Sequence, residues 1–159
     1  MQTKRNDLDR FDRAILDILG SDGRISVTEL AARVGLSKSP VQARLKRLEQ
    51  DGIITGYRAT IDPVRLDREH VAFVKVKLSD TRETALAAFN AAVQAIPEVE
   101  QCHLIAGNFD YLMKVRTSDM TRYRAILASR ISTLPHVAHT STFVAMQAVK
   151  DSAWAVAEA

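Results

Sequence analysis

In this chain of 159 residues, the spacing of helix signals between residues 26 and 50 is the feature that most constrains the possible folds. Ser26–Glu29 has the capping-box sequence that opens a helix, and Gly35 can adopt the left-handed conformation that ends one. Ser37 or Ser39 can then cap the next helix, in which Pro40 occupies the first turn and needs no N–H partner. Two helices joined by so short a turn predict a helix-turn-helix.

A third helix is predicted before this pair, over about Asp9–Leu19. Apolar residues recur there at steps of three and four: Leu8, Phe11, Ile15, Ile18 and Leu19. After the pair, which should end at Asp51-Gly52, residues 53–62 are rich in β-branched and aromatic side chains and predict a small hairpin, or wing. Asp62-Pro63 marks a boundary, because proline forces the preceding residue into an extended conformation. We therefore predict a winged helix-turn-helix domain over residues 1–62 and a linker over residues 63–70.

Residues 71–150 show a repeated exchange of strand and helix patterns. Val71–Leu78 alternates in the manner of a strand, and its apolar face consists of Ala72, Val74, Val76 and Leu78. Two helical stripes, closed by Pro97 and Pro135, are followed by further strands at residues 99–106, 111–117 and 137–149. This βαββαβ order predicts a ferredoxin-like antiparallel sheet with both helices on one face. The chain is thus predicted to be an α+β protein.

The other face of this sheet should be bare. It carries Val71 and Phe73 beside Lys75 and Lys77, so we expect it to pack on a second subunit. A dimer would bring together two DNA-binding domains. The tail at residues 151–159 is interpreted as a loosely held end or an assembly contact.

The overall charge permits nucleic-acid binding without demanding it. The net charge is +3 and the sequence pI is about 9.2, and each half of the chain is nearly neutral. The single cysteine, Cys102, excludes an intramolecular disulfide and fits a reducing compartment. The sequence contains neither a signal-peptide pattern at its start nor a run of about 18 apolar residues. We expect a soluble, cytoplasmic (nucleoid-associated) protein that makes no membrane contact.

The charge is concentrated on the second helix of the helix-turn-helix. Val41, Leu45 and Leu48 face inward, and the opposite side is basic. In this motif the second helix enters the major groove of double-stranded DNA, with its first turns nearest the bases. Gln42 can bond to adenine, and the methyl group of Ala43 can pack on that of thymine. The predicted DNA-binding residues are Ser37, Lys38, Ser39, Gln42, Ala43, Arg44, Lys46 and Arg47, of which Arg44, Lys46 and Arg47 are placed for phosphates.

Other functions have weaker support in the sequence. The basic helix could be an ordinary solvated surface, and the protein could be a ligand-independent architectural DNA-binding protein or a small enzyme on a ferredoxin-like domain. His136 and His139 are three positions apart and would point to opposite faces of a strand, so they predict no shared metal ion. Neither a Gly-x-Ser-x-Gly elbow nor a phosphate-binding glycine loop is present. We expect no catalytic residues, no metal and no cofactor.

Three long stretches of the chain resemble the leucine-responsive regulatory protein/AsnC family, the feast/famine transcription regulators. They are "LDRFDRAILDIL", "RISVTELAARVGLSKSPVQARLKRLEQDGIITGYRATIDPVRL" and "HLIAGNFDYLMKVRTSDMTRYRAILASRISTLPHVAHTSTFVAMQAVK". The resemblance covers nearly the whole chain, from Leu8 to Lys150. It implies an effector-binding and oligomerisation domain over residues 71–150, homodimers that assemble further, often into octamers, and a free amino acid as effector.

The resemblance also implies where the effector binds, between C-terminal domains of adjacent dimers. The matching positions are Leu104, Ala106, Gly107, Asn108, Phe109, Asp110, Met120, Thr140, Thr142, Phe143, Val144 and Ala145. A glycine-containing turn exposes N–H donors for a carboxylate, and Asp110 could face the ammonium group. Without the family, Gly107-Asn108 would be interpreted as a tight hairpin turn and Asp110 as its cap. Leucine, methionine and proline are the first candidates, and the sequence implies control of amino-acid metabolism or transport genes.

Overall fold

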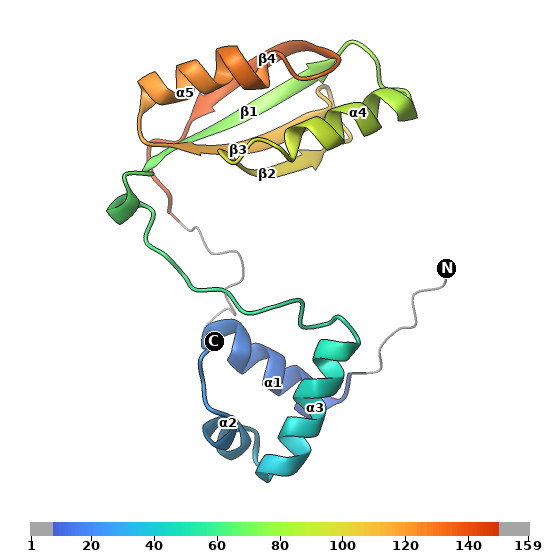
Figure 1. Ribbon diagram of the computed structural model, residues 1–159, viewed down its shortest axis with the longest axis vertical. Helices are drawn as coiled ribbons and strands as arrows, with labels where there is room; N and C mark the ends of the chain where they lie inside the picture. Colours follow the sequence, from blue (N-terminus) through green and yellow to red (C-terminus); the bar gives the residue numbers. More distant parts are fainter. Residues whose placement is uncertain (1–7, 150–159) are drawn as a thin grey trace. The chain divides into compact units, whose positions relative to one another are not determined.

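The computed structural model describes residues 8–149. Backbone contacts divide the chain into two compact units, of which the first ends at Thr60 and the second spans Ile61–Val149 (Figure 1). The tail predicted at residues 151–159 lies outside the described residues. The predicted domain limits at residues 62 and 70 stay predictions, and the segment between them contains a short 3₁₀ helix at Val64–Leu66.

The first unit is built from three helices. They are α1 (Arg10–Ser21), α2 (Val27–Val34) and α3 (Lys38–Gln50). Their inward side chains form one small core, in which the buried residues are Ile15, Leu30, Ala31, Val41 and Leu48. The helix-turn-helix predicted from the tight turn is confirmed: Gly35 adopts the left-handed conformation after α2, with φ of 73°.

The caps of these helices differ partly from the prediction. At α2 the hydroxyl of Ser26 accepts a bond from the N–H of Glu29, but the Glu29 carboxylate binds Arg33 at 2.6 Å. The complete reciprocal capping box lies at α1, between Asp9 and Asp12. An ion pair one turn along the helix competes with the return bond of a capping box, because both use the same carboxylate.

The predicted wing does not form within the described chain. Residues 53–62 contain no strand. The N–H groups of Ile53 and Ile54 both bind the carbonyl of Leu48, and the hydroxyl of Tyr57 binds Glu49. The end of α3 therefore uses the backbone donors that would begin a hairpin ladder.

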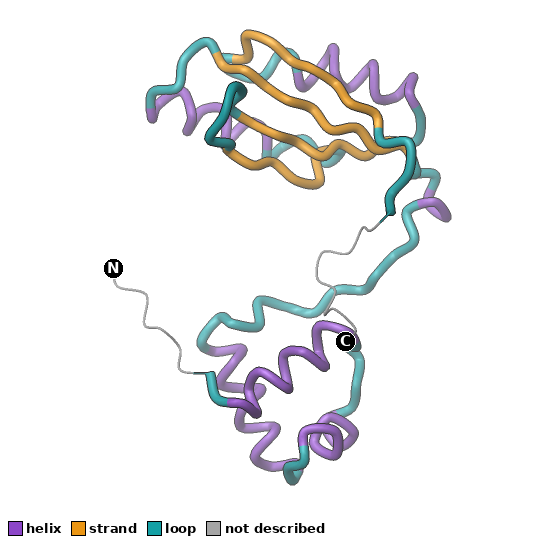
Figure 2. Tube along the Cα trace, turned by 180° about the vertical axis from the view of Figure 1, so that it is seen from behind, coloured by secondary structure: helices purple, strands orange, loops and turns teal. Residues whose placement is uncertain are grey.

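The second unit has the predicted βαββαβ order. Its elements are β1 (His70–Leu78), α4 (Glu83–Val93), β2 (Val99–Leu104), β3 (Tyr111–Thr117), α5 (Met120–Ile126) and β4 (Val137–Val144). The four strands are antiparallel in the order β2-β3-β1-β4. Both helices cover one face, as Figures 1 and 2 show from opposite sides. The ferredoxin-like fold is thus confirmed.

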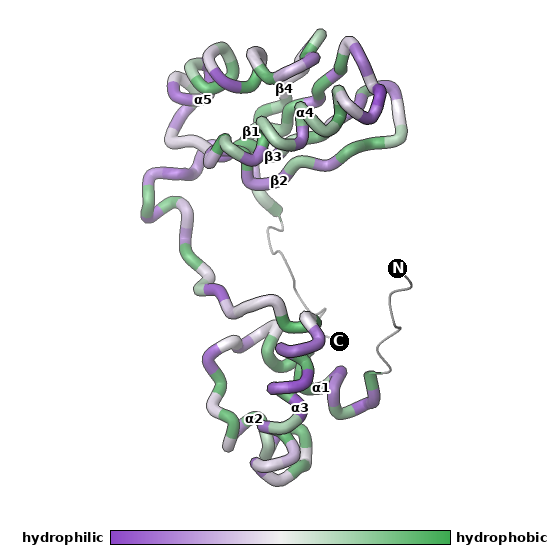
Figure 3. Tube along the Cα trace, turned by 45° about the vertical axis from the view of Figure 1, so that its right-hand side comes forward, coloured by the Kyte–Doolittle hydropathy of each residue, from purple (hydrophilic) through white to green (hydrophobic). Residues whose placement is uncertain are grey.

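The covered face holds the core of this unit. The alternate residues of β1 predicted to point inward are all buried, and they pack against Phe89 of α4 and Tyr123 of α5. Figure 3 colours the chain by hydropathy, and both hydrophobic and hydrophilic stretches occur along the sheet. Two predicted strands were too long, because β2 ends at Leu104 and β4 at Val144. For β4 the reason lies in its partner strand. The N–H of Ala145 binds the carbonyl of Val71, the second residue of β1, so β1 ends where a longer β4 would need a partner.

Candidate DNA-binding surface and effector site

Exposure along α3 follows the predicted two-sided pattern. Val41 and Leu48 are fully buried, and Leu45 is half-buried against the same core. The exposed positions include the predicted Lys38, Ser39, Gln42, Ala43, Lys46 and Arg47. One exposed face of a helix-turn-helix therefore offers amide, methyl and cationic groups of the kind that read base edges and bind phosphates.

The N-terminal end of α3 adds backbone donors to this face. Ser37 is the N-cap residue, and its hydroxyl makes no capping bond. The first N–H groups of a helix lack partners within the helix, and Pro40 removes one of them at the third position. Such an end favours a negative charge, so it can approach a phosphate group.

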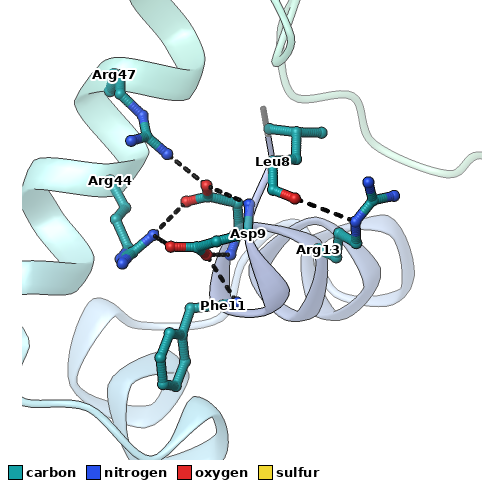
Figure 4. Close-up of polar contacts among 7 residues, drawn as sticks. Leu8, Asp9, Phe11, Arg13, Arg44 and Arg47 are labelled. Carbon is teal, nitrogen blue, oxygen red and sulfur yellow. Dashed lines mark hydrogen bonds and ion pairs between the residues drawn. The ribbon is translucent and has the colours of Figure 1, made fainter. Parts of the chain in front are cut away.

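Arg44 and Arg47 do not extend freely from this face. Arg44 Nη1 lies 2.7 Å from Asp9 Oδ2 and 2.7 Å from Asp12 Oδ1, and Arg47 Nη2 lies 2.5 Å from Asp12 Oδ2. Figure 4 shows both guanidinium groups of α3 directed toward the start of α1. The Arg44 side chain is 24% exposed and the Arg47 side chain 49% exposed. No pattern in the sequence indicates this pairing, which changes the role available to Arg44.

The charges of this cluster stabilise one another. The backbone N–H of Asp12, together with the Arg44 guanidinium, holds the pKa of the Asp9 carboxyl below its ordinary value. Hydrogen bonds to Asp12 and Asp9 raise the pKa of Arg44 above its ordinary value. Lys38 and Lys46, by contrast, form no ion pair within residues 8–149. Among the described residues, the positive charge of α3 that takes part in no ion pair therefore lies at these two lysines.

In the second unit, the predicted effector loop after β2 is tied to β1. The N–H of Ile105 binds the carbonyl of Asp110 at 2.8 Å, and the N–H of Asp110 binds Val76. The Asp110 carboxylate accepts the N–H of Leu78 at 2.7 Å and Lys77 Nζ at 3.0 Å. Burial acts to raise the pKa of Asp110, but these donors outweigh it and leave that pKa below its ordinary value. Asp110 thus fastens the loop to β1 through its carboxylate.

A hollow of about 310 Å³ adjoins this loop on the uncovered face of the sheet. Its lining includes Asn108, Phe109 and Phe143 from the predicted set, together with Ser141 of the same last strand. Lys75, Lys77 and His139 also line it and were not predicted as effector contacts. Lys75 Nζ lies 4.9 Å from the ring centres of both Phe109 and Phe143. The alternation of β1 had placed the lysines on this face, but their contact with the loop depends on the pairing of β1 with β3 and β4.

The remaining predicted effector residues lie elsewhere. Thr140, Thr142 and Val144 pair with core residues of β1 and so belong to the helix-covered side. Thr142 shares a 2.6 Å hydrogen bond with the hydroxyl of Tyr123. Met120 follows the end of β3, whereas the loop precedes the start of β3. The seven residues of β3 span about 20 Å, so Met120 and the loop lie at opposite ends of this strand.

Within one chain the predicted effector residues therefore form two groups. The loop group consists of Leu104, Ala106, Gly107, Asn108, Phe109 and Asp110, with Phe143 of β4 facing the same hollow. The distal group consists of Met120, Val144 and Ala145, toward the opposite end of the sheet. Thr140 and Thr142 lie between the two groups, on the helix-covered side.

The described residues show no other arrangement that suggests chemistry. No group of three or more His, Cys, Asp or Glu side chains in residues 8–149 could hold a metal ion. His136 precedes β4 in a left-handed conformation, with φ of 64°, instead of extending the strand. Burial raises the pKa of the Cys102 thiol to about 11. None of the helices within residues 8–149 is long and apolar enough to cross a bilayer.

Comparisons with known proteins agree with both units. The family description "Lrp/AsnC ligand binding domain" matches residues 71–155, and "Winged helix-turn-helix DNA-binding" matches residues 8–55. A proline dehydrogenase transcriptional activator of Rhizobium radiobacter is 59% identical over 94% of this chain and 96% of its own length. The protein of the same name from Rhodobacter capsulatus is 57% identical over 89% and 92%.

Solved structures show the same architecture. A transcriptional regulator from Neisseria meningitidis, determined in complex with L-Met, has a TM-score of 0.86 and 31% identity, and the alignment covers 92% of this chain and 94% of that one.

Proposed function

Because the chain belongs to the Lrp/AsnC family of DNA-binding transcriptional regulators, we propose that it activates a proline dehydrogenase gene in response to proline. The observation that carries the proposal is the 59% identity, over nearly the full length of both chains, to an activator named for that gene. A second activator of the same name is 57% identical. Among leucine, methionine and proline, proline is the substrate of the enzyme whose gene these relatives control.

The loop group suits one end of such a ligand. An amino acid needs N–H donors for its carboxylate and an apolar surface for its side chain. The exposed turn at Gly107 and Asn108 offers backbone donors, and the rings of Phe109 and Phe143 offer apolar surface beside the cation of Lys75. Asp110 fixes the shape of this loop through Leu78 and Lys77, so we assign it a positioning role.

The distal group would complete the site from another copy. A free amino acid is too small to bridge the length of β3, so one chain cannot bring both groups to the same ligand. If Met120, Val144 and Ala145 of a neighbouring copy approach the loop, ligand binding and assembly become linked. The ligand would then shift the balance between assemblies, and DNA affinity would change with it.

Assembly begins, in this proposal, at the uncovered face of the sheet. Phe73 and Phe143 pair across β1 and β4 and are 36% and 50% exposed. Apolar side chains of this size on an open sheet face favour a second copy as the cover, which gives a homodimer. Further assembly to an octamer or a similar oligomer would bring the loop and distal groups together. The protein would act in the cytoplasm, at the nucleoid.

On DNA, the exposed face of α3 would lie in the major groove. We assign base contacts to Lys38, Ser39, Gln42 and Ala43, and phosphate contacts to Ser37, Lys46 and Arg47. Replacing Gln42 by alanine should lower the preference for the operator, whereas Lys46→Ala should weaken binding to every duplex. Gln50→Ala, in the last turn of α3, is a matched control. Equal losses on specific and scrambled duplexes for Gln42→Ala would contradict the base-reading assignment.

The function is tested by fluorescence anisotropy with the DNA upstream of the proline dehydrogenase gene and a scrambled duplex, at fixed salt. Proline, leucine and methionine are added separately. A preference for the native duplex that changes with proline alone would support the proposal. A response to leucine or methionine instead would refute the effector assignment but not the regulatory function. Equal binding to both duplexes, unaffected by any amino acid, would favour a ligand-independent architectural protein.

A further inference from the structure

Asp12 is a buried carboxylate in the first turn of α1. Its side chain is 1% exposed. It accepts hydrogen bonds from the N–H of Asp9 at 3.2 Å, from Arg44 at 2.7 Å and from Arg47 at 2.5 Å. A buried charge is costly unless it is paired and hydrogen-bonded, and here both carboxylate oxygens are occupied.

Asp9 extends the same cluster to the surface. Its carboxylate caps α1 by accepting the N–H groups of Phe11 and Asp12, both at 2.9 Å, and it also binds Arg44 at 2.7 Å. The Arg44 guanidinium lies 5.5 Å from the centre of the Phe11 ring. The start of α1 is thus fastened to the middle of α3, 32 to 35 residues along the chain.

The two arginines hold different positions in this cluster. Arg44 binds both carboxylates and is three-quarters covered, so its charge is used within the unit. Arg47 binds Asp12 and is half-exposed, directly after the exposed Lys46. A long cationic side chain loses rotamer freedom when it binds a phosphate, and a partner that already restrains it reduces that loss.

We propose that Asp12 is a positioning residue for DNA recognition, which sets α3 against α1 through Arg44 and directs Arg47 toward the phosphate backbone. Arg44 then serves the fold and does not contact phosphate, in contrast to the role predicted from its sequence position. The inference rests on DNA binding by this unit and is independent of the identity of the effector.

Asp12→Asn is the direct test, and Glu29→Gln is its matched control. Both variants remove one negative charge from the same unit, but the Glu29 carboxylate is 54% exposed and pairs only along α2. If charge alone mattered, both variants would bind DNA slightly more tightly. If Asp12 acts by positioning the arginines, the two variants should differ in DNA affinity. Asp12→Asn should lower the affinity for specific and scrambled duplexes about tenfold, because charge-assisted bonds are lost, whereas Glu29→Gln should not lower it. Equal behaviour of the two folded variants would overturn the proposal.

The salt dependence of binding separates Arg44 from a phosphate contact. The logarithm of the binding constant falls with the logarithm of salt concentration by about 0.9 for each phosphate contact. Lys46→Gln and Arg47→Gln should each lower this slope by about that amount per bound copy. Arg44→Gln should lower affinity and leave the slope unchanged, because it removes only an internal contact. A slope for Arg44→Gln that falls as it does for Lys46→Gln would refute the internal role.

These measurements use the full chain, and circular dichroism at the assay temperature shows which variants are folded. If Asp12→Asn is unfolded, Arg44→Gln decides the question, since it leaves Asp12 paired with Arg47 and the N–H of Asp9. An affinity loss with an unchanged salt slope would then support positioning. Unchanged affinity would contradict it. Neither result depends on proline, so a failure of the effector assignment is recognised separately.

Discussion

Replacement of Asp110 by asparagine tests whether the effector loop is held in place by one carboxylate. In the native protein this side chain is 13% exposed and accepts the N–H of Leu78 and the Nζ of Lys77. Asparagine has nearly the same shape and keeps an acceptor for Leu78. The substitution therefore removes the charge and leaves most of the packing intact.

The expected cost follows from the two bonds. A hydrogen bond to a charged group contributes about 1.5–3 kcal/mol and a neutral one about 0.5–1.5 kcal/mol, so the Leu78 bond should weaken by about 1–1.5 kcal/mol. Lys77 is 48% exposed, which limits its ion pair to about 0.2–1 kcal/mol. The free energy of unfolding of the unit Ile61–Val149 should therefore fall by about 1–2.5 kcal/mol in Asp110→Asn. The response of DNA binding to proline should weaken as well, because the loop loses its anchor.

Urea unfolding followed by circular dichroism measures the stability, and hydrogen exchange of the Leu78 amide measures the local bond. Glu69→Gln is the control, since that carboxylate is exposed and forms no ion pair within residues 8–149, and it should change neither quantity. An unchanged stability together with unchanged exchange at Leu78 would refute the anchoring role of Asp110.

The pH dependence gives an independent check. The pKa of Asp110 is lower in the folded chain than its ordinary value of 3.8, so its contribution is fully present above that value. It is lost as the pH falls through the lower, folded-state pKa. The stability difference between the native protein and Asp110→Asn should thus be constant near neutral pH and shrink below about pH 4.

Three further outcomes are expected. Leu48→Ala leaves a cavity at a fully buried position in the small core of the first unit, so it should lower the stability of that unit by about 2–5 kcal/mol and abolish DNA binding. Leu104→Ala, at a 60% exposed position, should have neither effect. Thermal unfolding and fluorescence anisotropy measure the two quantities. Gly35→Ala meets no atom within 4 Å but must adopt φ of 73°, so denaturation should show a loss of about 1–2 kcal/mol. Cys102, with a pKa of about 11, should react with a disulfide reagent much more slowly at pH 8 than free cysteine, and an equal rate would contradict its burial.

Local sequence signals predicted most of the fold. The limits predicted for β3 from the turn that precedes it, Tyr111–Thr117, agree with the structure, and the exposed face of α3 follows from its period. Gly35 ends α2 as expected, because the requirement for a left-handed residue is local. The wing was predicted incorrectly from residues 53–62, since strand-forming residues make a hairpin only where a partner is available.

The residues that define the sites could be named from the sequence, but their contacts could not. The resemblance supplied the effector positions, yet their separation into two groups depends on which end of β3 and which side of β4 each occupies. The pairing of Arg44 with Asp12 was missed for the same reason. No pattern within either helix records it, and Asp12 is not among the residues that the helical periodicity singles out.

The sequence by itself determined the elements, their order, the two-sided character of α3 and the family. These properties depend on periodicity, caps and turns, which act over a few residues. Only the tertiary structure decided that Asp12 holds Arg44 and Arg47, that Asp110 closes its loop on Leu78, and that Lys75 lies between two phenylalanine rings. Each of these contacts joins residues about 30 or more positions apart, so the partner of each charge is chosen by the packing of whole elements.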